Sequence, residues 1–505
     1  MRFKKSLMNS VIGMVTFIIS FLPIFIVRKV FIDVLGSDLA GLTSLYTNII
    51  GYLTIIEMGV GTAIICSLYK PFDENNQEKV VGYLKYYRKF YRLAALFIFV
   101  AGIILVPFLH VFIKGSINTG YIKIGFILFL INTVIIYLFG YKQCILNVAQ
   151  EGYKISIALT SAKVLIAIAQ IFIVEKYKSF YGYLIAQIII NIIFYALINY
   201  YTDRSYPWLR KTKGKINSEE KKELVKTIKG ISLHKIGAVL VFGTDNIVIS
   251  AFIGLNSVTL YNNYIIVINA FGGIVNQAVV GVTASIGNLL LDDDKEHTYK
   301  THKRLFLANF WIASFISITL VNTLTSFVEL WLGKQFALSW EIVALLVINL
   351  YFQMIRGQVE QFKNASGEFY RDRFAPLFEG AINLVISLIL VRYIGLAGVL
   401  IGTVVSNFTV IFWTQPYVVY KYVFKKPLHE YFARYFKYIL VGIIPLILTM
   451  ALTYYLKADV TFLSFIINCF INILVINIFY LIVFWRTEEF QFFKNLAFRI
   501  LKRGN

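Results

Sequence analysis

Cysteine and histidine are scarce in this chain of 505 residues, which contains three Cys and five His. Cys66, Cys144 and Cys469 are far apart, and each lies in or beside an apolar segment. A disulfide framework or a cysteine-based metal site needs more cysteines at closer spacing. His297 and His302 form one close pair, but they lie in a stretch rich in acidic and basic residues. The sequence therefore predicts neither disulfides nor a metal site.

Charged residues are also few. They make up 15% of the chain, against 58% hydrophobic residues, and the mean hydropathy is +0.71. Such a composition excludes a soluble globular protein and is typical of a chain that crosses a membrane many times. A spanning helix needs about 20 apolar residues, since each residue adds about 1.5 Å to its length. We therefore expect an all-α polytopic membrane protein.

Apolar runs of sufficient length predict about fourteen transmembrane helices. They lie at about Leu7–Val27, Leu42–Leu68, Leu93–Ile113, Ile124–Phe139, Ile155–Val174, Tyr183–Tyr200, Gly230–Ile253, Leu260–Leu290, Leu305–Phe327, Glu341–Phe362, Phe374–Val391, Gly395–Val418, Tyr438–Leu456 and Thr461–Trp485.

The basic residues predict the orientation. The net charge is +22, and most of the 49 Lys and Arg lie in alternate loops between the predicted spans. Cytoplasmic loops of membrane proteins carry such an excess, so we place these loops, the N-terminus and the C-terminus in the cytoplasm. Because the positive charge is spread over short loops, nucleic-acid binding is not expected.

The external connections are too short to carry an enzyme site. Those near Val328–Trp340 and Arg28–Gly41 are each about a dozen residues long under this orientation. The chain has no Gly-x-x-x-x-Gly-Lys phosphate loop and no recognisable pair of catalytic carboxylates. We expect a protein that is not an enzyme, with no catalytic residues and no cofactor.

The chain repeats itself at an offset of about 217 residues. VLGSDLAGLTSLYTNII after the first span matches FIGLNSVTLYNNYII after the seventh, which pairs Gly36 with Gly254, Leu42 with Leu260 and Tyr46 with Tyr264. NVAQEGYK matches NASGEFYR in the same register. A third match pairs Gly182, Leu184, Ile185 and Asn191 with Gly398, Leu400, Ile401 and Asn407, in that order. The fold expected is thus two pseudo-symmetric six-helix lobes plus two C-terminal helices.

The repeat predicts the domain bounds. Lobes with the same orientation in the membrane enclose a site between them in many transporters. The predicted divisions are an N-terminal lobe at 1–200, a basic cytoplasmic linker at 201–229, a C-terminal lobe at 230–418, two further spans at 419–485 and a basic tail at 486–505.

Two segments carry a family resemblance: Val27–Pro71, VRKVFIDVLGSDLAGLTSLYTNIIGYLTIIEMGVGTAIICSLYKP, and Thr244–Tyr264, TDNIVISAFIGLNSVTLYNNY. With the span count and the repeat, the chain resembles the Wzx-like polysaccharide repeat-unit flippases. These belong to the oligosaccharide flippase family of the multidrug/oligosaccharidyl-lipid/polysaccharide exporter superfamily. The resemblance implies a flippase in the plasma (inner) membrane of a bacterium, which moves an undecaprenyl-diphosphate-linked oligosaccharide from the inner to the outer leaflet by alternating access. It also implies lipid partners, a polysaccharide polymerase and glycosyltransferases, and often coupling to a Na⁺ or H⁺ gradient.

Cationic side chains within spans or at the end of a span are candidates to bind the diphosphate, because an anion in a low-dielectric cavity needs compensating charge. These are Arg28, Lys29, Lys163, Lys235 and Arg356. Snorkelling to the membrane interface is the alternative for Arg28, Lys29 and Lys235, and an interhelical hydrogen bond is the alternative for Lys163.

A polar stripe in the tenth span predicts a cavity wall. Gln353, Arg356, Glu360 and Asn364 recur at helical spacing, with Arg356 and Glu360 placed as an i,i+4 ion pair. That pair could also be purely structural.

Acidic side chains in spans are candidates for coupling or gating. These are Glu57, Asp245 with His234 on the same helix face, and Glu360. A carboxylate in a cavity can bind Na⁺ or carry a proton, and the alternative is a simple pair with a nearby Lys or Arg.

Three other functions stay open. A lipid II flippase or a cation-coupled drug exporter would share the fold, and a membrane polysaccharide polymerase is disfavoured by the short external loops.

Overall fold

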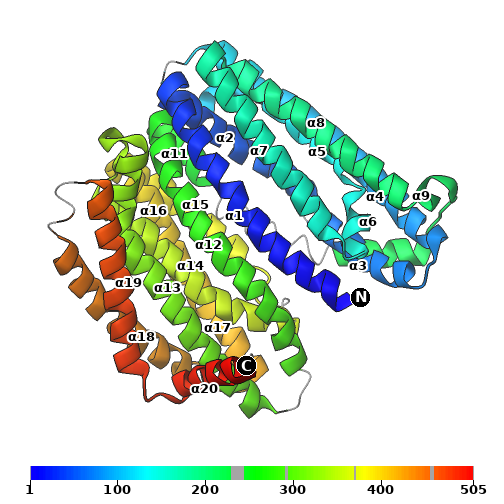
Figure 1. Ribbon diagram of the computed structural model, residues 1–505. Helices are drawn as coiled ribbons and strands as arrows, with labels where there is room; N and C mark the ends of the chain where they lie inside the picture. Colours follow the sequence, from blue (N-terminus) through cyan, green and yellow to red (C-terminus); the bar gives the residue numbers. More distant parts are fainter. Residues whose placement is uncertain are drawn as a thin grey trace. The chain divides into compact units, whose positions relative to one another are not determined.

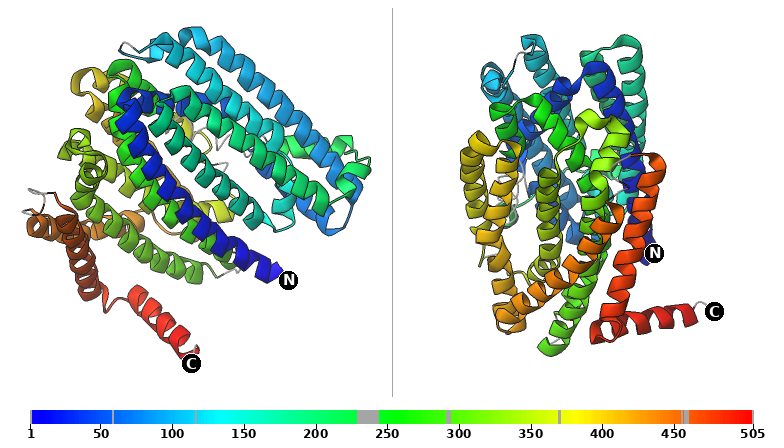
Figure 2. Two further views of the ribbon diagram at one scale, coloured as in Figure 1. Left: turned by 45° about the horizontal axis from the view of Figure 1, so that its top comes forward. Right: turned by 90° about the vertical axis from the view of Figure 1, so that its left-hand side faces the viewer.

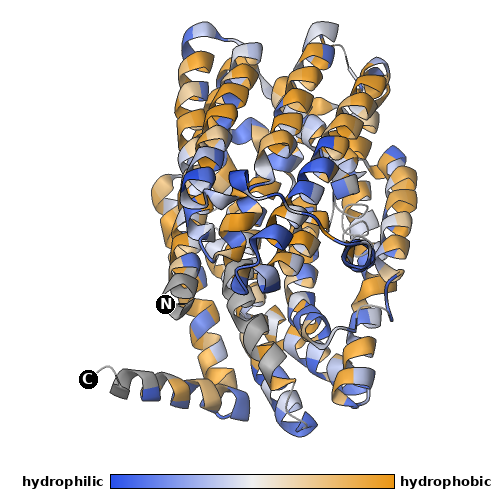
Figure 3. Cartoon of the chain, turned by 90° about the vertical axis from the view of Figure 1, so that its right-hand side faces the viewer, coloured by the Kyte–Doolittle hydropathy of each residue, from blue (hydrophilic) through white to orange (hydrophobic). Residues whose placement is uncertain are grey.

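The computed structural model describes residues 2–57, 59–115, 117–228, 244–290, 294–368, 371–454, 456 and 460–503. Every regular element within these ranges is a helix (Figure 1). Twelve helices in them are long and apolar enough to cross a membrane, and Figure 3 shows hydrophobic residues over most of their length. The chain is thus a multi-pass, all-α membrane protein, as its composition predicts.

The chain divides into two compact units, Met1–Asn262 and Asn263–Asn505. The predicted lobe and linker bounds stay a prediction.

In unit 1, α1 packs on α7, α5 packs on α4 and α8, and α2 packs on α11. Its helices are α1 (Arg2–Leu35), α2 (Ser37–Leu53), η1 (Thr54–Glu57), α3 (Val60–Asp73), α4 (Gln77–Leu105), η2 (Val106–Phe112), α5 (Thr119–Gly140), α6 (Gln143–Val148), α7 (Gly152–Tyr177), α8 (Phe180–Ser205), α9 (Trp208–Lys211), α11 (Thr244–Phe252) and the start of α12 (Leu255–Leu289).

Unit 2 is built around α13, which packs against α14, α18 and α19. Its last helix, α20, turns away from α19 in both views of Figure 2. Its elements are the rest of α12, α13 (Lys295–Leu332), η3 (Lys334–Phe336), α14 (Trp340–Ser366), α15 (Ala375–Ile394), α16 (Leu396–Ser406), the π-helical turns η4 (Asn407–Ile411) and η5 (Val419–Phe424), α17 (Phe412–Val418), α18 (His429–Thr453), α19 (Phe462–Phe484) and α20 (Glu488–Arg503).

The second predicted span, Leu42–Leu68, is not one continuous helix, and that expectation was wrong. α2 ends at Leu53, the chain passes through the 3₁₀ turn η1, and α3 begins at Val60. Gly59 has φ 96°, a left-handed conformation that a glycine adopts without strain and that ends a helix. The break places Glu57 at a turn instead of inside a helix.

The seventh predicted span, Gly230–Ile253, falls mostly outside the described residues, and α11 is the part that the structure describes.

Two glycines matched in the repeat have the same backbone role. Gly36 precedes α2 with φ 89°, and Gly254 precedes α12 with φ 136°. Side chains with a Cβ atom rarely adopt these values, so both turns require glycine. The repeat therefore includes the backbone geometry of the two turns.

Two tyrosines matched in the repeat are also equivalent. Tyr46 and Tyr264 are completely buried. Tyr46 donates its hydroxyl to the carbonyl of Ile122 at 2.8 Å, near the start of α5. Tyr264 accepts at its hydroxyl from the amide of Leu338 at 2.8 Å, just before α14. Each tyrosine ties the helix after its glycine turn to the beginning of a later spanning helix in its own unit.

Candidate functional site

A polar cavity of about 490 Å³ lies in unit 2 among α12, α13 and α14. Three glycines, Gly272, Gly273 and Gly357, keep part of its wall free of side chains. The polar side chains that line it are Asn269, Asn309, Gln353, Glu360, Gln361 and Asn364. A cavity with this many amides inside a membrane protein is costly unless the amides face water or a hydrogen-bonding ligand.

Three members of the predicted polar stripe line this cavity. Gln353, Glu360 and Asn364 lie on one face of α14, together with Gly357. Asn309 of α13 donates to the carbonyl of Met354 at 2.9 Å and so fixes the opposite wall against the same helix. The cavity thus has a row of hydrogen-bonding groups along α14, and α13 is hydrogen-bonded to that helix beside it.

The fourth member of the stripe, Arg356, points elsewhere. Its Nη1 lies 3.4 Å from Oε1 of Glu379 on α15, and the two side chains are 15% and 6% exposed. The predicted i,i+4 pair with Glu360 is therefore wrong, since the partner comes from the next helix. Nε of Arg356 has no hydrogen-bond partner among the described residues. Glu360 is left to line the cavity and is near enough to Glu379 to interact with it electrostatically.

Asp245 is a buried carboxylate in unit 1. Its Oδ2 accepts a hydrogen bond from the Tyr261 hydroxyl at 3.1 Å, and its Oδ1 has no hydrogen-bond partner within the described ranges. Beside it, Asn262 of α12 donates to Asn246 of α11 at 2.8 Å. The site is a carboxylate with one free oxygen at the junction of α11 and α12.

Glu57 lies among phenol rings. It accepts a hydrogen bond from the Tyr91 hydroxyl at 2.9 Å. Tyr91 packs against Tyr87 and Tyr137, with ring centroids 4.2 and 5.2 Å away. The break between α2 and α3 thus brings an acidic side chain against aromatic residues of α4 and α5.

The candidate cations of unit 1 lie in three different settings. Arg28 donates to the carbonyl of Ala40 at 3.3 Å, which ties α1 to α2. Lys29 lies 3.7 Å from Asp33, and about half of each side chain is exposed. Lys163 is exposed on α7. Arg28 and Lys29 are neighbours on α1, whereas Lys163 lies on α7. The remaining candidates, His234 and Lys235, lie outside the described residues.

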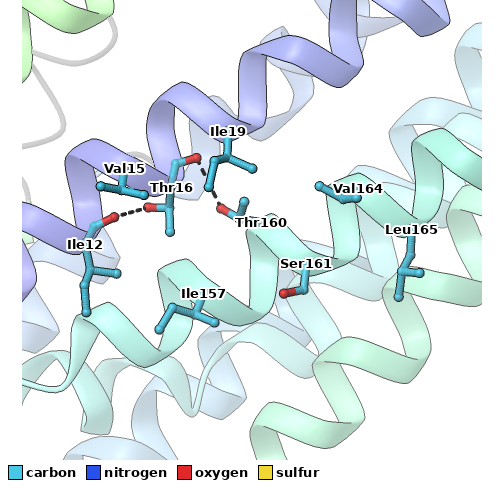
Figure 4. A pocket seen from close by; sticks show the side chains of 9 residues that line it. All are labelled: Ile12, Val15, Thr16, Ile19, Ile157, Thr160, Ser161, Val164 and Leu165. Atoms are coloured by element: carbon cyan, nitrogen blue, oxygen red, sulfur yellow. Dashed lines mark hydrogen bonds between the residues drawn. The ribbon is translucent and has the colours of Figure 1, made fainter.

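A second recess, of about 490 Å³, lies between α1 and α7 (Figure 4). Its lining is mostly Ile, Val and Leu, with Thr16, Thr160 and Ser161 as the polar members. Thr160 donates weakly to the Thr16 carbonyl at 3.5 Å. Lys163 is not part of this lining, so the recess presents an apolar surface with a few hydroxyls.

Sequence reasoning missed four residues of the polar site in unit 2. Asn269, Asn309 and Gln361 line the cavity, and Glu379 holds Arg356. Each of these four residues is a polar residue within a different apolar run of the sequence. Sequence spacing alone cannot show that residues on different helices meet in space. Helical periodicity finds groups on one helix only.

Solved structures share this fold. The lipid II flippase MurJ, in an inward closed conformation, matches with a TM-score of 0.65 and 15% identity, over 95% of this chain and 99% of MurJ. A multidrug resistance MATE family transporter of the MOP superfamily, in its inward-facing conformation, matches with a TM-score of 0.60 and 15% identity, over 77% and 91%. The Vibrio cholerae MATE transporter VcmN in its bent form matches with a TM-score of 0.56 and 15% identity, over 83% and 97%.

This chain has the fold shared by MurJ and the MATE transporters. No family model matches the sequence, and no curated protein matches it. At 15% identity the likeness to solved structures concerns the fold alone.

Proposed function

We propose that this protein is a flippase that moves an undecaprenyl-diphosphate-linked oligosaccharide repeat unit, of the capsule, exopolysaccharide or O-antigen type, from the inner to the outer leaflet. Two lobes would open alternately to the two sides of the membrane. The observation that carries the proposal is the match along nearly the whole chain to a protein named as a lipid II flippase.

The extent of the match favours a lipid-linked cargo over a drug. MurJ covers 95% of this chain, whereas the two MATE transporters cover 77% and 83%. A chain built for drug export on the MATE plan would not need the additional length.

The polar cavity has the chemistry of a sugar site. Amide side chains both donate and accept hydrogen bonds, which suits the hydroxyl groups of an oligosaccharide. Glu360 adds an acceptor, and the lining that the structure describes includes no Lys or Arg. We therefore assign this cavity to the sugar portion of the cargo.

The diphosphate portion requires cations from elsewhere. Arg28, Lys163, Lys235 and Arg356 remain the candidates, and Lys29 is a weaker one because it is exposed beside Asp33. Glu57, Asp245, His234 and Glu360 remain candidates for Na⁺ or H⁺ coupling. Asp245 is favoured among them, since one of its carboxylate oxygens is buried without a partner in the described part of the chain.

Lipid II is the second candidate cargo, because the whole-length match is to a lipid II flippase. In the repeat-unit case, the partners are the glycosyltransferases that supply the lipid-linked oligosaccharide and a polymerase that consumes it.

Native mass spectrometry of the purified full-length protein distinguishes these cargoes. We expect undecaprenyl-diphosphate oligosaccharides to bind more tightly than undecaprenyl phosphate or lipophilic drug cations. Binding to lipid II at least as tight as to the oligosaccharides would support the second candidate. Binding to drug cations alone would contradict a lipid-linked cargo.

A further inference from the structure

A groove of about 700 Å³ lies on unit 2 between the start of α15 and the segment of η4 and α17, and we call it the α15–α17 groove. Phe374, Phe378 and Trp413 line it and are 53%, 64% and 47% exposed. Large apolar side chains with this exposure, on helices long enough to span a membrane, contact lipid acyl chains. The groove therefore offers a recessed apolar surface on which a single acyl chain can lie.

One end of the α15–α17 groove carries three cations. Arg371 and Arg373 line it directly. The guanidinium of Arg371 lies 3.6 Å from the ring centroid of Tyr422, and the Lys421 ammonium lies 4.9 Å from that of Tyr417. Cation–π contacts of this kind hold the charges at the groove without neutralising them.

A buried ion pair fixes the turn that presents the two arginines. Asp372, which lies between them in sequence, is buried, and Nζ of Lys363 lies 2.6 Å from its Oδ2. The Asp372 carboxylate is therefore compensated inside the protein. Glu368 pairs with Arg371 at 2.7 Å, so this end of the groove carries three cations and one partly exposed carboxylate.

A polar group in the groove wall has no partner in the protein. Oγ1 of Thr414 is buried and makes no hydrogen bond to the described residues, although it belongs to the lining. A hydroxyl in this position can donate to an ester carbonyl between a lipid headgroup and its acyl chains.

We propose that the α15–α17 groove binds an anionic glycerophospholipid such as phosphatidylglycerol. The phosphate lies at Arg371, Arg373 and Lys421, and one acyl chain lies along Phe374, Phe378 and Trp413. The orientation predicted from the basic loops puts the cationic end at the cytoplasmic face, where anionic lipids attract basic residues. The site shares no lining residue with the polar cavity, so the bound phospholipid is not the transported cargo.

Native mass spectrometry of the full-length protein in detergent tests this site. Phosphatidylglycerol and phosphatidylcholine with identical acyl chains are compared, since they differ in net charge. We expect phosphatidylglycerol to bind at least about tenfold more tightly, because basic residues near a lipid surface attract a headgroup that carries a net negative charge. The double variant Arg371→Ala/Arg373→Ala should lose this preference and keep the weaker phosphatidylcholine binding.

Two further variants make the result specific. Arg392→Ala removes an arginine from the last turn of α15, at the other end of that helix from Arg371 and Arg373, and should leave the preference unchanged. Ile382→Trp should fill the groove, leave all three cations, and reduce binding of both lipids. Thermal unfolding of each variant checks that it is folded.

Three outcomes would overturn the proposal. The two lipids could bind equally to the unchanged protein, the double arginine variant could keep the full preference, or inorganic phosphate could compete as well as phosphatidylglycerol does. A dimer that excludes lipid would instead assign the groove to a second copy of the chain and would also contradict the site.

Discussion

At the scale of single residues, the buried carboxylate of Asp245 is unusual because a spanning helix rarely buries an acidic side chain. Asp245 receives one hydrogen bond, from Tyr261, and its other oxygen has none in the described ranges. A charge at the centre of a spanning helix costs about 2.5 to 3.5 kcal/mol on insertion scales. From this cost and the incomplete set of partners we expect Asp245 to bind a cation, in line with the proposed function.

Asp245→Asn tests this role. Asparagine keeps the volume and can still accept the hydrogen bond from Tyr261, so thermal stability should change little. Transport should fall several-fold and lose its dependence on a Na⁺ or pH gradient, because the charge that binds the cation is gone. Tyr261→Phe is the control: it removes the hydrogen bond and keeps the charge, so gradient dependence should persist. Unchanged transport and gradient response in the asparagine variant would exclude Asp245 from coupling.

The pair of Arg356 and Glu379 calls for a double-mutant cycle. Arg356→Ala leaves a buried carboxylate unpaired and should lower the free energy of unfolding by about 3 kcal/mol. Arg356→Ala/Glu379→Ala leaves no orphan charge and should recover most of that stability. If Arg356 also contacts the diphosphate, the double variant should unfold normally and still fail to transport. Recovery of transport together with stability would limit Arg356 to the ion pair.

These two sites differ in how much of them the sequence could predict. The sequence placed Asp245 in an apolar run, and the cost of burial made it a candidate at once. It also found the stripe on α14, but it paired Arg356 with Glu360. The i,i+4 rule describes one helix in isolation, whereas Glu379 reaches Arg356 from α15.

At the scale of helices, a buried amide network joins the last two spans to α13. Asn322 of α13 donates to the Thr449 hydroxyl of α18 and to Oδ1 of Asn472 of α19, each at 2.9 Å. Asn468 returns a bond to the Asn322 carbonyl at 3.0 Å. All four side chains are buried. The network specifies where α18 and α19 dock on unit 2.

Asn322→Leu should loosen that docking. The change removes the interhelical donor to the Thr449 hydroxyl and to Oδ1 of Asn472, although both side chains keep hydrogen bonds within their own helices. Interhelical hydrogen bonds in membrane proteins contribute about 0.6 kcal/mol on average, up to about 1.7. We expect the thermal midpoint to fall by a few degrees and proteolysis between α18 and α19 to accelerate. Cys469→Ala, on the same helix as Asn472, should leave both measurements unchanged. A thermal midpoint equal to that of the unchanged protein would contradict a role for this network in docking α18 and α19.

The helices also show the limits of hydropathy as a predictor. Twelve of the predicted spans correspond to long apolar helices, because length and composition decide whether a segment can cross a membrane. Leu42–Leu68 met the same criteria and is nonetheless broken. Gly59 with its left-handed backbone ends the helical path, and hydropathy averages over that single position.

At the scale of the whole molecule, orientation rests on the basic loops. Tags at 204–229 and after Arg486 should report the cytoplasm, and a tag at Val328–Trp340 should report the outside, because translocating a cluster of Lys and Arg is strongly disfavoured. When each tag contains a cysteine, labelling with an impermeant thiol reagent in intact cells shows whether that tag is outside. An external signal from the 204–229 loop would contradict both the orientation and the number of spans.

Transport itself is the central claim, and reconstitution measures it most directly. The full-length protein is placed in proteoliposomes with a fluorescent undecaprenyl-diphosphate oligosaccharide, and the label is made accessible to an impermeant quencher on one side only. The account predicts protein-dependent movement of the label between leaflets, faster under a Na⁺ or pH gradient. It also predicts slow movement in the Asp245→Asn variant and in a Gln353→Leu/Asn364→Leu variant of the polar cavity. Label movement no faster than in protein-free vesicles, with the protein folded and correctly inserted, would contradict the assignment as a lipid-linked oligosaccharide flippase.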